Sequence, residues 1–517
     1  TMVKWEYPIN SDPENTSLDP DMGYSFSQAY AVNSAAGWVV IFGNGYDSQN
    51  GEAVLYVLRI NSDGSLVSPT PRKIRTYVGD SGPNCNGLST PALIDVDLDG
   101  LVDFAFAGDL LGNMWKFDLR DASVSNWDVA YNTQPDDSGF PKPLFQAKNQ
   151  AGFRQPITTR PDVMRHCRAN LDGYMVLFGT GRYLGLDDFA DAEAIQSLYG
   201  IWDWAEEWEN LGSLATVERR NPTAKYLGEF DANRQLSNLV SNPAIPDTEQ
   251  TLYVIGLESA SSGDEVRVDG RTYTFSNLTN VENAEFLGTA GLQECINDAT
   301  YGVPGVRAQA SPYYVVLRTD PPGGTISVTA TPGIQLGTID LKVTLQSQNL
   351  IGADEQYLFV SQNPVEWFEP RTGAGLHVGW YYDMPSTSER LVNDVIIRDG
   401  ILYAVANIPS ESPCEAGGNS IIYALNACTG AGLWDPVFDI NGDERVNTSD
   451  LINIGTAANP IWVAPSGLRR GGLLYSPAIL GIPGSDKSIL HFSTSSGKLE
   501  SEIAIAEKLG FLYWRTW

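Results

Sequence analysis

Basic residues are scarce in this sequence. Its 517 residues include 33 Lys and Arg against 63 Asp and Glu, so the formal net charge is −30. A chain of this charge repels nucleic-acid phosphates, and no stripe of Lys or Arg offsets the repulsion. Duplex nucleic acid is therefore excluded as an expected partner. A disordered chain is also excluded, because 42% of the residues are hydrophobic and 10% are aromatic.

Long apolar runs are absent as well. No stretch reaches the roughly 18 apolar residues of a membrane-spanning helix, and the first residues, Thr1–Glu6, lack the basic and then apolar layout of a signal peptide. We expect a chain that does not span a membrane and was cut from a longer precursor with its targeting signal elsewhere. The 50 Gly and 30 Pro fit turn-rich β structure, and strong acidity with few Lys favours a secreted or surface protein.

Cysteine and histidine motifs are missing too. The five Cys form no CxxC pair, which argues against structural zinc, and the three His form no HExxH motif. No recognisable catalytic arrangement exists, although His166 beside Cys167 is left open, and we expect no enzyme activity. Cys414 and Cys428 close a short loop and could pair in an oxidising compartment. At least one cysteine is left over, and a buried, inert thiol is its expected state.

What the sequence does contain is a recurring short apolar run that ends in small residues and a turn. Such runs of β-branched and aromatic residues, bounded by Gly or Asn, are typical of buried strands. Several are followed by a second recurring strand, and two are preceded by a matching leading strand. The apolar runs are 39–45, 104–109, 175–181, 402–407 and 489–494; the following strands are 54–58, 113–118, 198–203 and 421–426; the leading strands are 89–94 and 475–480. Irregularly repeated multi-strand units indicate a β-propeller.

The rhythm breaks between residues 249 and 352. Here 269–275 and 325–331 alternate in the manner of half-exposed strands, so we predict an inserted β-rich module between a first propeller part, 1–248, and a last part, 353–517. The insertion weakly resembles small repeats of bacterial surface and phage-tail proteins. The remaining length predicts about seven blades, within the usual range of roughly four to eight. The predicted fold is thus an all-β, about seven-bladed propeller with an inserted module.

The stretch 95–103 has the spacing of a calcium loop. Carboxylates occupy positions 1, 3, 5 and 9, glycine occupies position 6, and the carbonyl of position 7 adds another oxygen. Four clustered carboxylates repel one another unless a cation lies between them. Position 12 is Phe106, so the loop leads into a strand and not into an EF-hand helix. The expected ligands are Asp95, Asp97, Asp99, Leu101 and Asp103. The alternative is an ordinary Asp/Gly-rich hairpin turn.

A second candidate loop, 439–450, lies in the last propeller part and resembles the calcium loop of dockerin modules. Its position 6 is Glu444, which should strain the bend because this position favours Gly. Residues 451–454 could begin the short helix that follows such a loop. The expected ligands are Asp439, Asn441, Asp443, Arg445 through its carbonyl, Asn447 and Asp450. The alternative is an uncharged Asx-turn loop, and a cohesin partner is disfavoured because dockerins carry two copies.

Together these pieces resemble the C-terminal β-propeller of the PilY-type type IV pilus biogenesis factors, which are pilus-tip adhesins. The segment 423–430, followed by Trp434, also looks like the blade motif of quinoprotein-type propellers. The segments that carry the PilY-type resemblance, in the order that the family has them, are 43–46, 86–91, 107–118, 155–161, 178–184, 379–382 with 389–390, and 408–430. The insertion and the dockerin-like loop depart from the family, and neither its N-terminal von Willebrand-type domain nor an RGD triplet is present.

The resemblance implies a structural and adhesive role in pilus assembly, extension, retraction, surface attachment and twitching motility. It also implies an extracellular location at the pilus tip or the bacterial cell surface, after export through the periplasm. The implied partners are minor pilins of the tip complex and a ligand on a host or abiotic surface. The family's calcium site falls on Asp95, Asp97, Asp99 and Asp103, and its loop disulfide on Cys414 and Cys428. Two alternatives remain: a calcium-dependent quinoprotein dehydrogenase, although the adjacent cysteine pair of those enzymes is absent, and a carbohydrate-binding propeller.

Overall fold

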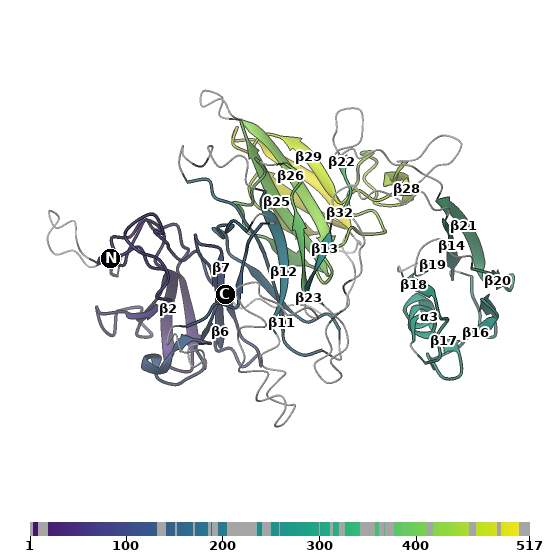
Figure 1. Cartoon of the computed structure of the whole chain (residues 1–517), viewed down its shortest axis with the longest axis horizontal. Coiled ribbons are helices and arrows are strands. Elements are labelled where there is room, and N and C mark those ends of the chain that lie inside the picture. Colours follow the sequence, from purple (N-terminus) through teal and green to yellow (C-terminus); the bar gives the residue numbers. More distant parts are fainter. Residues whose placement is uncertain are drawn as a thin grey trace. The chain divides into compact units, whose positions relative to one another are not determined.

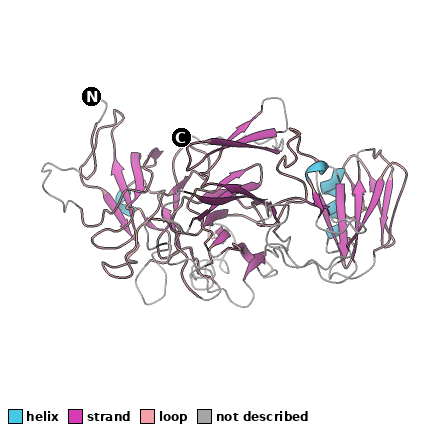
Figure 2. Cartoon of the chain, turned by 90° about the horizontal axis from the view of Figure 1, so that it is seen from above, coloured by secondary structure: helices cyan, strands magenta, loops and turns pink. Residues whose placement is uncertain are grey.

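The fold is built almost entirely of strands and loops, as predicted (Figures 1 and 2). The computed structural model describes residues 4–8, 19–131, 141–149, 152–168, 171–184, 188, 195–203, 235–239, 250–257, 259–298, 300–310, 314–319, 326–341, 357–360, 365, 367, 377–386, 388–410, 417–453, 462–482 and 487–505. No helix among these residues has the length and apolar character needed to cross a membrane.

The chain divides into two compact units. Unit 1 comprises Thr1–Ser241, Gly352–Leu433 and Ser466–Trp517, and unit 2 comprises Asn242–Ile351 and Trp434–Pro465. Unit 2 therefore includes the second candidate calcium loop, 439–450, and not only the predicted insertion 249–352. The chain leaves unit 1 twice, once between two paired strands of one sheet and once between two paired strands of the next.

The described part of unit 1 contains five blade-like sheets, which we name blades A to E. Blade A is β1 (Tyr30–Ser34), β2 (Gly37–Gly43), β3 (Val54–Arg59) and β4 (Arg72–Arg75). Blade B is β5 (Ala92–Ile94), β6 (Phe104–Gly108), β7 (Asn113–Asp118) and β8 (Asp128–Val129), with β9 (Phe145–Gln146) also on β7 and the 3-10 turn η1 (Val124–Asn126) before β8.

Blades C and D carry the two excursions to unit 2. Blade C has the order β10 (Asp162–Arg165), β11 (Tyr174–Gly179), β12 (Ser197–Asp203), β23 (His377–Asp383), β13 (Gln235–Leu239). Blade D has the order β24 (Ile396–Arg398), β25 (Ile401–Pro409), β26 (Gly418–Asn426), β29 (Gly467–Gly471), β22 (Tyr357–Leu358). Blade E is β30 (Ala478–Gly481), β31 (Lys487–Ser493) and β32 (Leu499–Ile505). The expected count of about seven blades is not confirmed.

One backbone contact recurs in all five blades. In each, a residue of the segment that leads into the blade pairs with a residue near the end of the blade's second strand. The five pairs are Tyr24 with Tyr46, Leu88 with Asp109, Ile157 with Gly181, Arg390 with Asn407, and Leu474 with Thr494. A buried polar side chain lies at the same strand end each time: Asn44, Asp109, Thr180, Asn407 and Thr494. Each of these side chains accepts a hydrogen bond from at or near the following strand, which is a reason for the apolar runs to end in such residues. The donors, in the same order, are Val54, Asn113, Ser197, Ser420 and Lys498.

Close packing between blades also explains why glycine occurs at these strand ends. A Cβ on Gly108 would overlap Ile157, and a Cβ on Gly179 would overlap Leu391, both from the segment leading into the next blade. The close approach of successive blades therefore requires a residue without a side chain at the end of β6 and of β11. The recurring pattern of an apolar run followed by glycine is thus the sequence trace of blade-on-blade packing.

Asp109 holds the turn of blade B from inside the core. Its Oδ1 accepts from the backbone N–H of Leu111 and Asn113 at 2.9 and 2.8 Å. Its Oδ2 accepts from Asn86 at 2.9 Å, and from the Asn113 amide and the Trp115 indole at 2.8 Å each. The side chain is fully buried. Burial raises the pKa of its carboxyl group, against the opposing effect of these donors.

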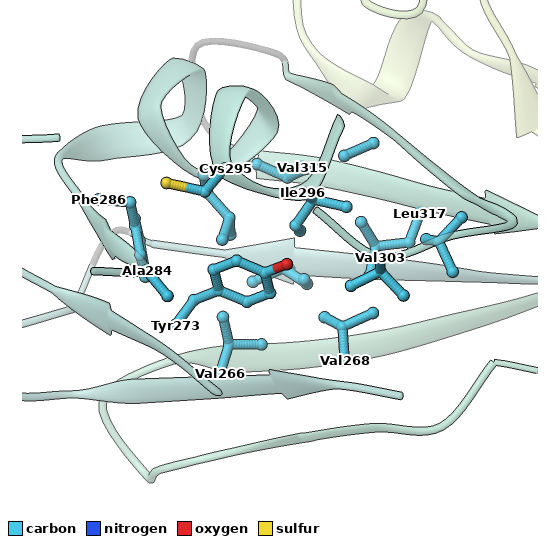
Figure 3. Close-up of a cluster of buried hydrophobic side chains, with 14 of the residues drawn as sticks. Val266, Val268, Tyr273, Ala284, Phe286, Cys295, Ile296, Val303, Val315 and Leu317 are labelled. Carbon is cyan, nitrogen blue, oxygen red and sulfur yellow. The ribbon is translucent and has the colours of Figure 1, made fainter. Parts of the chain in front are cut away.

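Unit 2 packs one helix and two sheets around its own hydrophobic core. Its elements are β14 (Gln250–Gly256), β15 (Glu265–Val268), β16 (Arg271–Phe275), β17 (Glu285–Phe286), α3 (Gly288–Asn297), β18 (Val306–Ala310), β19 (Tyr314–Thr319), β20 (Val328–Ala330), β21 (Gln335–Leu341), the 3-10 turn η3 (Thr448–Asp450), β27 (Ile452–Asn453) and β28 (Trp462–Val463). Figure 3 shows Cys295 and Ile296 of α3 facing Tyr273, Val266 and Val268 of one sheet and Val315 and Leu317 of the other. The buried thiol of Cys295 is part of this core.

Candidate metal-binding loops

Loop 1, residues 95–103, connects β5 to β6 at the edge of blade B. The carboxylate of Asp95 accepts from the backbone N–H of Leu98, Asp99 and Gly100, at 2.7, 3.2 and 2.7 Å. The second carboxylate of the loop, at position 3, accepts from position 5 at 3.2 Å, and the third, at position 5, accepts from position 7 at 2.8 Å. Short acidic side chains thus fold the backbone around themselves.

Loop 2, residues 439–450 of unit 2, repeats this pattern position for position. Asp439 at position 1 accepts from positions 4, 5 and 6 at 2.8, 3.2 and 2.7 Å. Asn441 at position 3 accepts from position 5 at 2.9 Å, and Asp443 at position 5 accepts from position 7 at 2.8 Å. Two loops in different units of the chain therefore adopt one local architecture.

Both loops place positions 4 and 6 in the left-handed region. In loop 1 these are Leu98 and Gly100, with φ of 64° and 86°, and in loop 2 they are Gly442 and Glu444, with φ of 75° and 63°. Each loop thus has one glycine at one of the two positions and a residue with a side chain at the other. The predicted bend at Glu444 is present, and its backbone conformation is one that side chains disfavour.

Replacement of Glu444 by glycine should stabilise loop 2. A residue with a Cβ in the left-handed region costs roughly 1 to 2 kcal/mol, part of which the greater backbone entropy of glycine offsets. We expect a gain of about 0.5 to 1 kcal/mol in the free energy of unfolding of the fold that contains loop 2. Urea unfolding of Glu444→Gly, with Asp399→Gly as a second site of positive φ, measures it. Equal or lower stability would show that the side chain of Glu444 makes a compensating contact.

Three carboxylates of loop 1 converge on one point. One oxygen each from Asp95, Asp97 and Asp99 lies within 4.8 Å of the others. Oxygens that share one Ca²⁺ lie at most about 4.6 to 5.2 Å apart, since each is about 2.3 to 2.6 Å from the ion. The residues present therefore fit a single calcium ion.

Asp103 closes loop 1. Its Oδ2 accepts from the backbone N–H of Val96 at 2.8 Å, so position 9 is joined to position 2. Burial raises the pKa of the Asp103 carboxyl group, and the negative charges of Asp97, Asp95 and Asp99 raise it further. A cation among these groups would remove the repulsion.

Asp450 closes loop 2 in the same way but from position 12. Its two oxygens accept from Ile440 and Asn441 at 3.0 and 3.4 Å and from Asn447 at 2.9 Å, and its side chain is buried. The Asn447 side chain in turn caps η3 by accepting from Ser449. Two of the predicted ligands thus serve the loop backbone. Among the described residues, the trio of carboxylates that converges within 4.8 Å is in loop 1 and not in loop 2.

The segment after loop 2 differs from the expectation. Residues 451–454 were expected to begin a helix, but the single turn η3 precedes them and Ile452–Asn453 is strand β27, paired with β28. In this strand, Ile452 pairs with Val463 of β28. The dockerin resemblance therefore extends to the loop and not to the element after it.

The disulfide pairing also differs from the expectation. Cys428 is bonded to Cys167, with 5.9 Å between the Cα atoms and a sequence separation of 261. The expected disulfide between Cys414 and Cys428 is thus wrong, because the partner of Cys428 is Cys167. Cys414 lies outside the described residues. The fold brings the turn after β26 of blade D beside the hairpin after β10 of blade C, a proximity that spacing along the chain cannot reveal.

His166 sits next to this disulfide as a buried aromatic side chain. Its ring centroid lies 4.8 Å from that of Trp202 and 4.4 Å from that of Trp367. Burial lowers the pKa of His166 to about 4, so the ring is neutral at physiological pH. The neighbouring Arg165 donates to the Val96 carbonyl of loop 1 at 2.8 Å. Contact with loop 1 is therefore made by the hairpin that carries the disulfide.

The family model described as PilY1 beta-propeller domain matches residues 2–234. Somewhat less than half of the chain is thus similar to the PilY1 β-propeller family. A type IV pilus biogenesis factor PilY1 homolog of Xylella fastidiosa is 42% identical over 197 residues, which are 37% of this chain and 13% of that protein. The type IV pilus biogenesis factor PilY1 of Pseudomonas aeruginosa strain UCBPP-PA14 is 37% identical over 238 residues, 43% of this chain and 19% of that protein.

The fold likeness extends beyond the PilY1 family match. The crystal structure of the Pseudomonas aeruginosa PilY1 C-terminal domain superposes with a TM-score of 0.54 and 22% identity, covering 94% of this chain and 74% of that one. The chain thus spans less than a fifth of the two curated PilY1 relatives but most of the solved domain. Those relatives are named as pilus biogenesis factors, not as enzymes.

Proposed function

We propose that this chain is the calcium-binding β-propeller of a type IV pilus-associated adhesin. The single observation that supports calcium most directly is the identical hydrogen-bond pattern of loops 1 and 2, at positions 1, 3 and 5. Asp95, Asp97, Asp99 and Asp103 with the Leu101 carbonyl would hold the ion in loop 1. Asp439, Asn441 and Asp443 with the Arg445 carbonyl would hold it in loop 2. The bound ion would supply charge neutralisation and no redox chemistry.

The proposed mechanism is electrostatic. Without a cation the carboxylates of loop 1 repel one another, and only the hydrogen bonds of the hairpin and of the loop oppose this repulsion. Neutralisation of loop 1 would fix this edge of blade B and the hairpin of Arg165 that contacts it. Coupling between calcium and any partner that binds this edge is reciprocal, so the partner would also raise the calcium affinity.

The proposed role follows the PilY1 family. Minor pilins of the tip complex and a ligand on a host or abiotic surface are the proposed partners, and pilus extension, retraction, attachment and twitching the processes served. In cells whose full-length protein carries Asp97→Ala, attachment and twitching should no longer respond to calcium, whereas Asp63→Ala, in an exposed Asx turn outside both loops, should behave as the parent. An unaltered calcium response of the Asp97→Ala strain would contradict this role.

A calcium-dependent quinoprotein dehydrogenase remains the second candidate, because such enzymes are also propellers. A purified protein with a quinone absorption band would favour the enzyme, and a colourless one the adhesin.

A further inference from the structure

Glu389 is a buried acid in the connection between blades C and D. It lies between β23 and β24, and its side chain has no exposed surface. Acids at such positions are uncommon unless a cation or several donors satisfy them. Its surroundings therefore decide whether the side chain is charged.

The contacts of Glu389 satisfy only one of its two oxygens. Oε1 accepts from the hydroxyl of Tyr423 on β26 at 2.5 Å. Oε2 is buried and accepts no hydrogen bond from any described residue. An ionised carboxylate with one bare oxygen in an apolar interface is costly, whereas the protonated acid carries no charge to desolvate.

The groups around Glu389 come from three strands and one turn. Tyr423 of β26 packs its ring 5.6 Å from that of Tyr382 of β23, and the backbone of Ser386 and the charge of Arg469 on β29 favour the ionised form. Burial outweighs these effects and raises the pKa of Glu389 to about 7. Both β23 and β26 are strands beside which the chain leaves unit 1 for unit 2.

We propose that the interface of blades C and D is a pH-sensitive joint, which is tight while Glu389 holds a proton and loosens when Glu389 is ionised. Because the folded-state pKa is raised, the contribution of Glu389 to stability is fully present below about pH 4.5 and is lost as the pH rises through about 7. The Cys167–Cys428 bond keeps the two blades joined on the loop side, so that loosening is local. Mildly acidic surroundings would thus stiffen the blades from which both excursions start.

Amide hydrogen exchange of the intact chain at saturating calcium tests the proposal. After correction for intrinsic rates, the opening constant of β23 and β26 should rise about tenfold from pH 6 to pH 8, as expected for a shift from 4.5 to about 7. Strands β2 and β3 of blade A should change much less. In Glu389→Gln the rise in blades C and D should disappear, whereas Glu500→Gln, at a partly exposed position on β32, should retain it.

Two outcomes would overturn the proposal. One is a rise in Glu389→Gln that equals that of the parent chain. The other is failure of Glu389→Gln to fold, because glutamine has the shape and the neutrality of the protonated acid that the proposal places in the folded interface. Tyr423→Phe adds an independent measurement: loss of the hydroxyl donor should move the midpoint of the rise to higher pH, and an unmoved midpoint would contradict the role of Glu389.

Discussion

Replacement of both Cys167 and Cys428 by serine should lower the free energy of unfolding by about 5 kcal/mol. The bond closes a loop across a sequence separation of 261 residues. In the chain-entropy description a loop of about 100 residues already contributes about 4.7 kcal/mol, and the contribution grows slowly with loop length. Urea unfolding of the double variant without reductant measures the change.

The control is Cys85→Ser, which removes a half-buried free thiol of blade B's leading segment. It should lower the stability by less than about 1 kcal/mol, as expected of a change that leaves no partner unpaired. Peptide mapping under non-reducing conditions should recover Cys167 joined to Cys428. Recovery of Cys414 joined to Cys428, or a double variant that unfolds at the same urea concentration as the parent, would contradict the pairing.

Asp109→Ala should cost at least about 3 kcal/mol. Five donors point at this carboxylate from Asn86, Leu111, Asn113 and Trp115, and a buried donor without an acceptor costs about 1 to 3 kcal/mol. The change also frees the fully buried indole of Trp115. Trp fluorescence and urea unfolding should therefore report the same lowered midpoint.

The matched control for this prediction is Asp80→Ala. Asp80 is exposed and accepts from Gly82 and Asn84 in a surface turn, so its loss should change the stability by less than about 0.5 kcal/mol. An Asp109→Ala variant as stable as Asp80→Ala would show that water replaces the carboxylate, and that the turn of blade B does not depend on it.

The repeat of the propeller could be read from the sequence because the physical constraint recurs locally. Gly108 and Gly179 end apolar runs where the next blade approaches, and each run is visible in isolation. The number of blades could not be predicted in this way, because that prediction divided the chain length outside the insertion by the usual length of one blade. The segment 434–465 belongs to unit 2, so length outside the insertion does not equal length in blades.

The local structure of the two candidate calcium loops could also be predicted from the sequence. Positions 1, 3 and 5 of 95–103 and 439–450 specify their own turns, because the Asp and Asn side chains there bond to backbone N–H groups only two to five residues away. The partner of Cys428 and the burial of Glu389 depend on contacts between blades C and D, which no local pattern contains. In the sequence, Glu389 stands out only as part of a segment that resembles the PilY-type family. Its charge state depends on burial, which only the fold reveals.

The most direct test of the central claim is a calorimetric calcium titration of the metal-stripped chain, with Asp97→Ala, Asp443→Ala and Asp63→Ala titrated in parallel. Two binding events are predicted for the parent chain and for Asp63→Ala, and one for each of the other variants. Affinities near the 10⁻⁴ to 10⁻³ M of extracellular modules would make the loops responsive to ambient calcium. Absence of binding heat, with a melting temperature that millimolar calcium does not change, would contradict the claim and leave both loops as ordinary Asx turns.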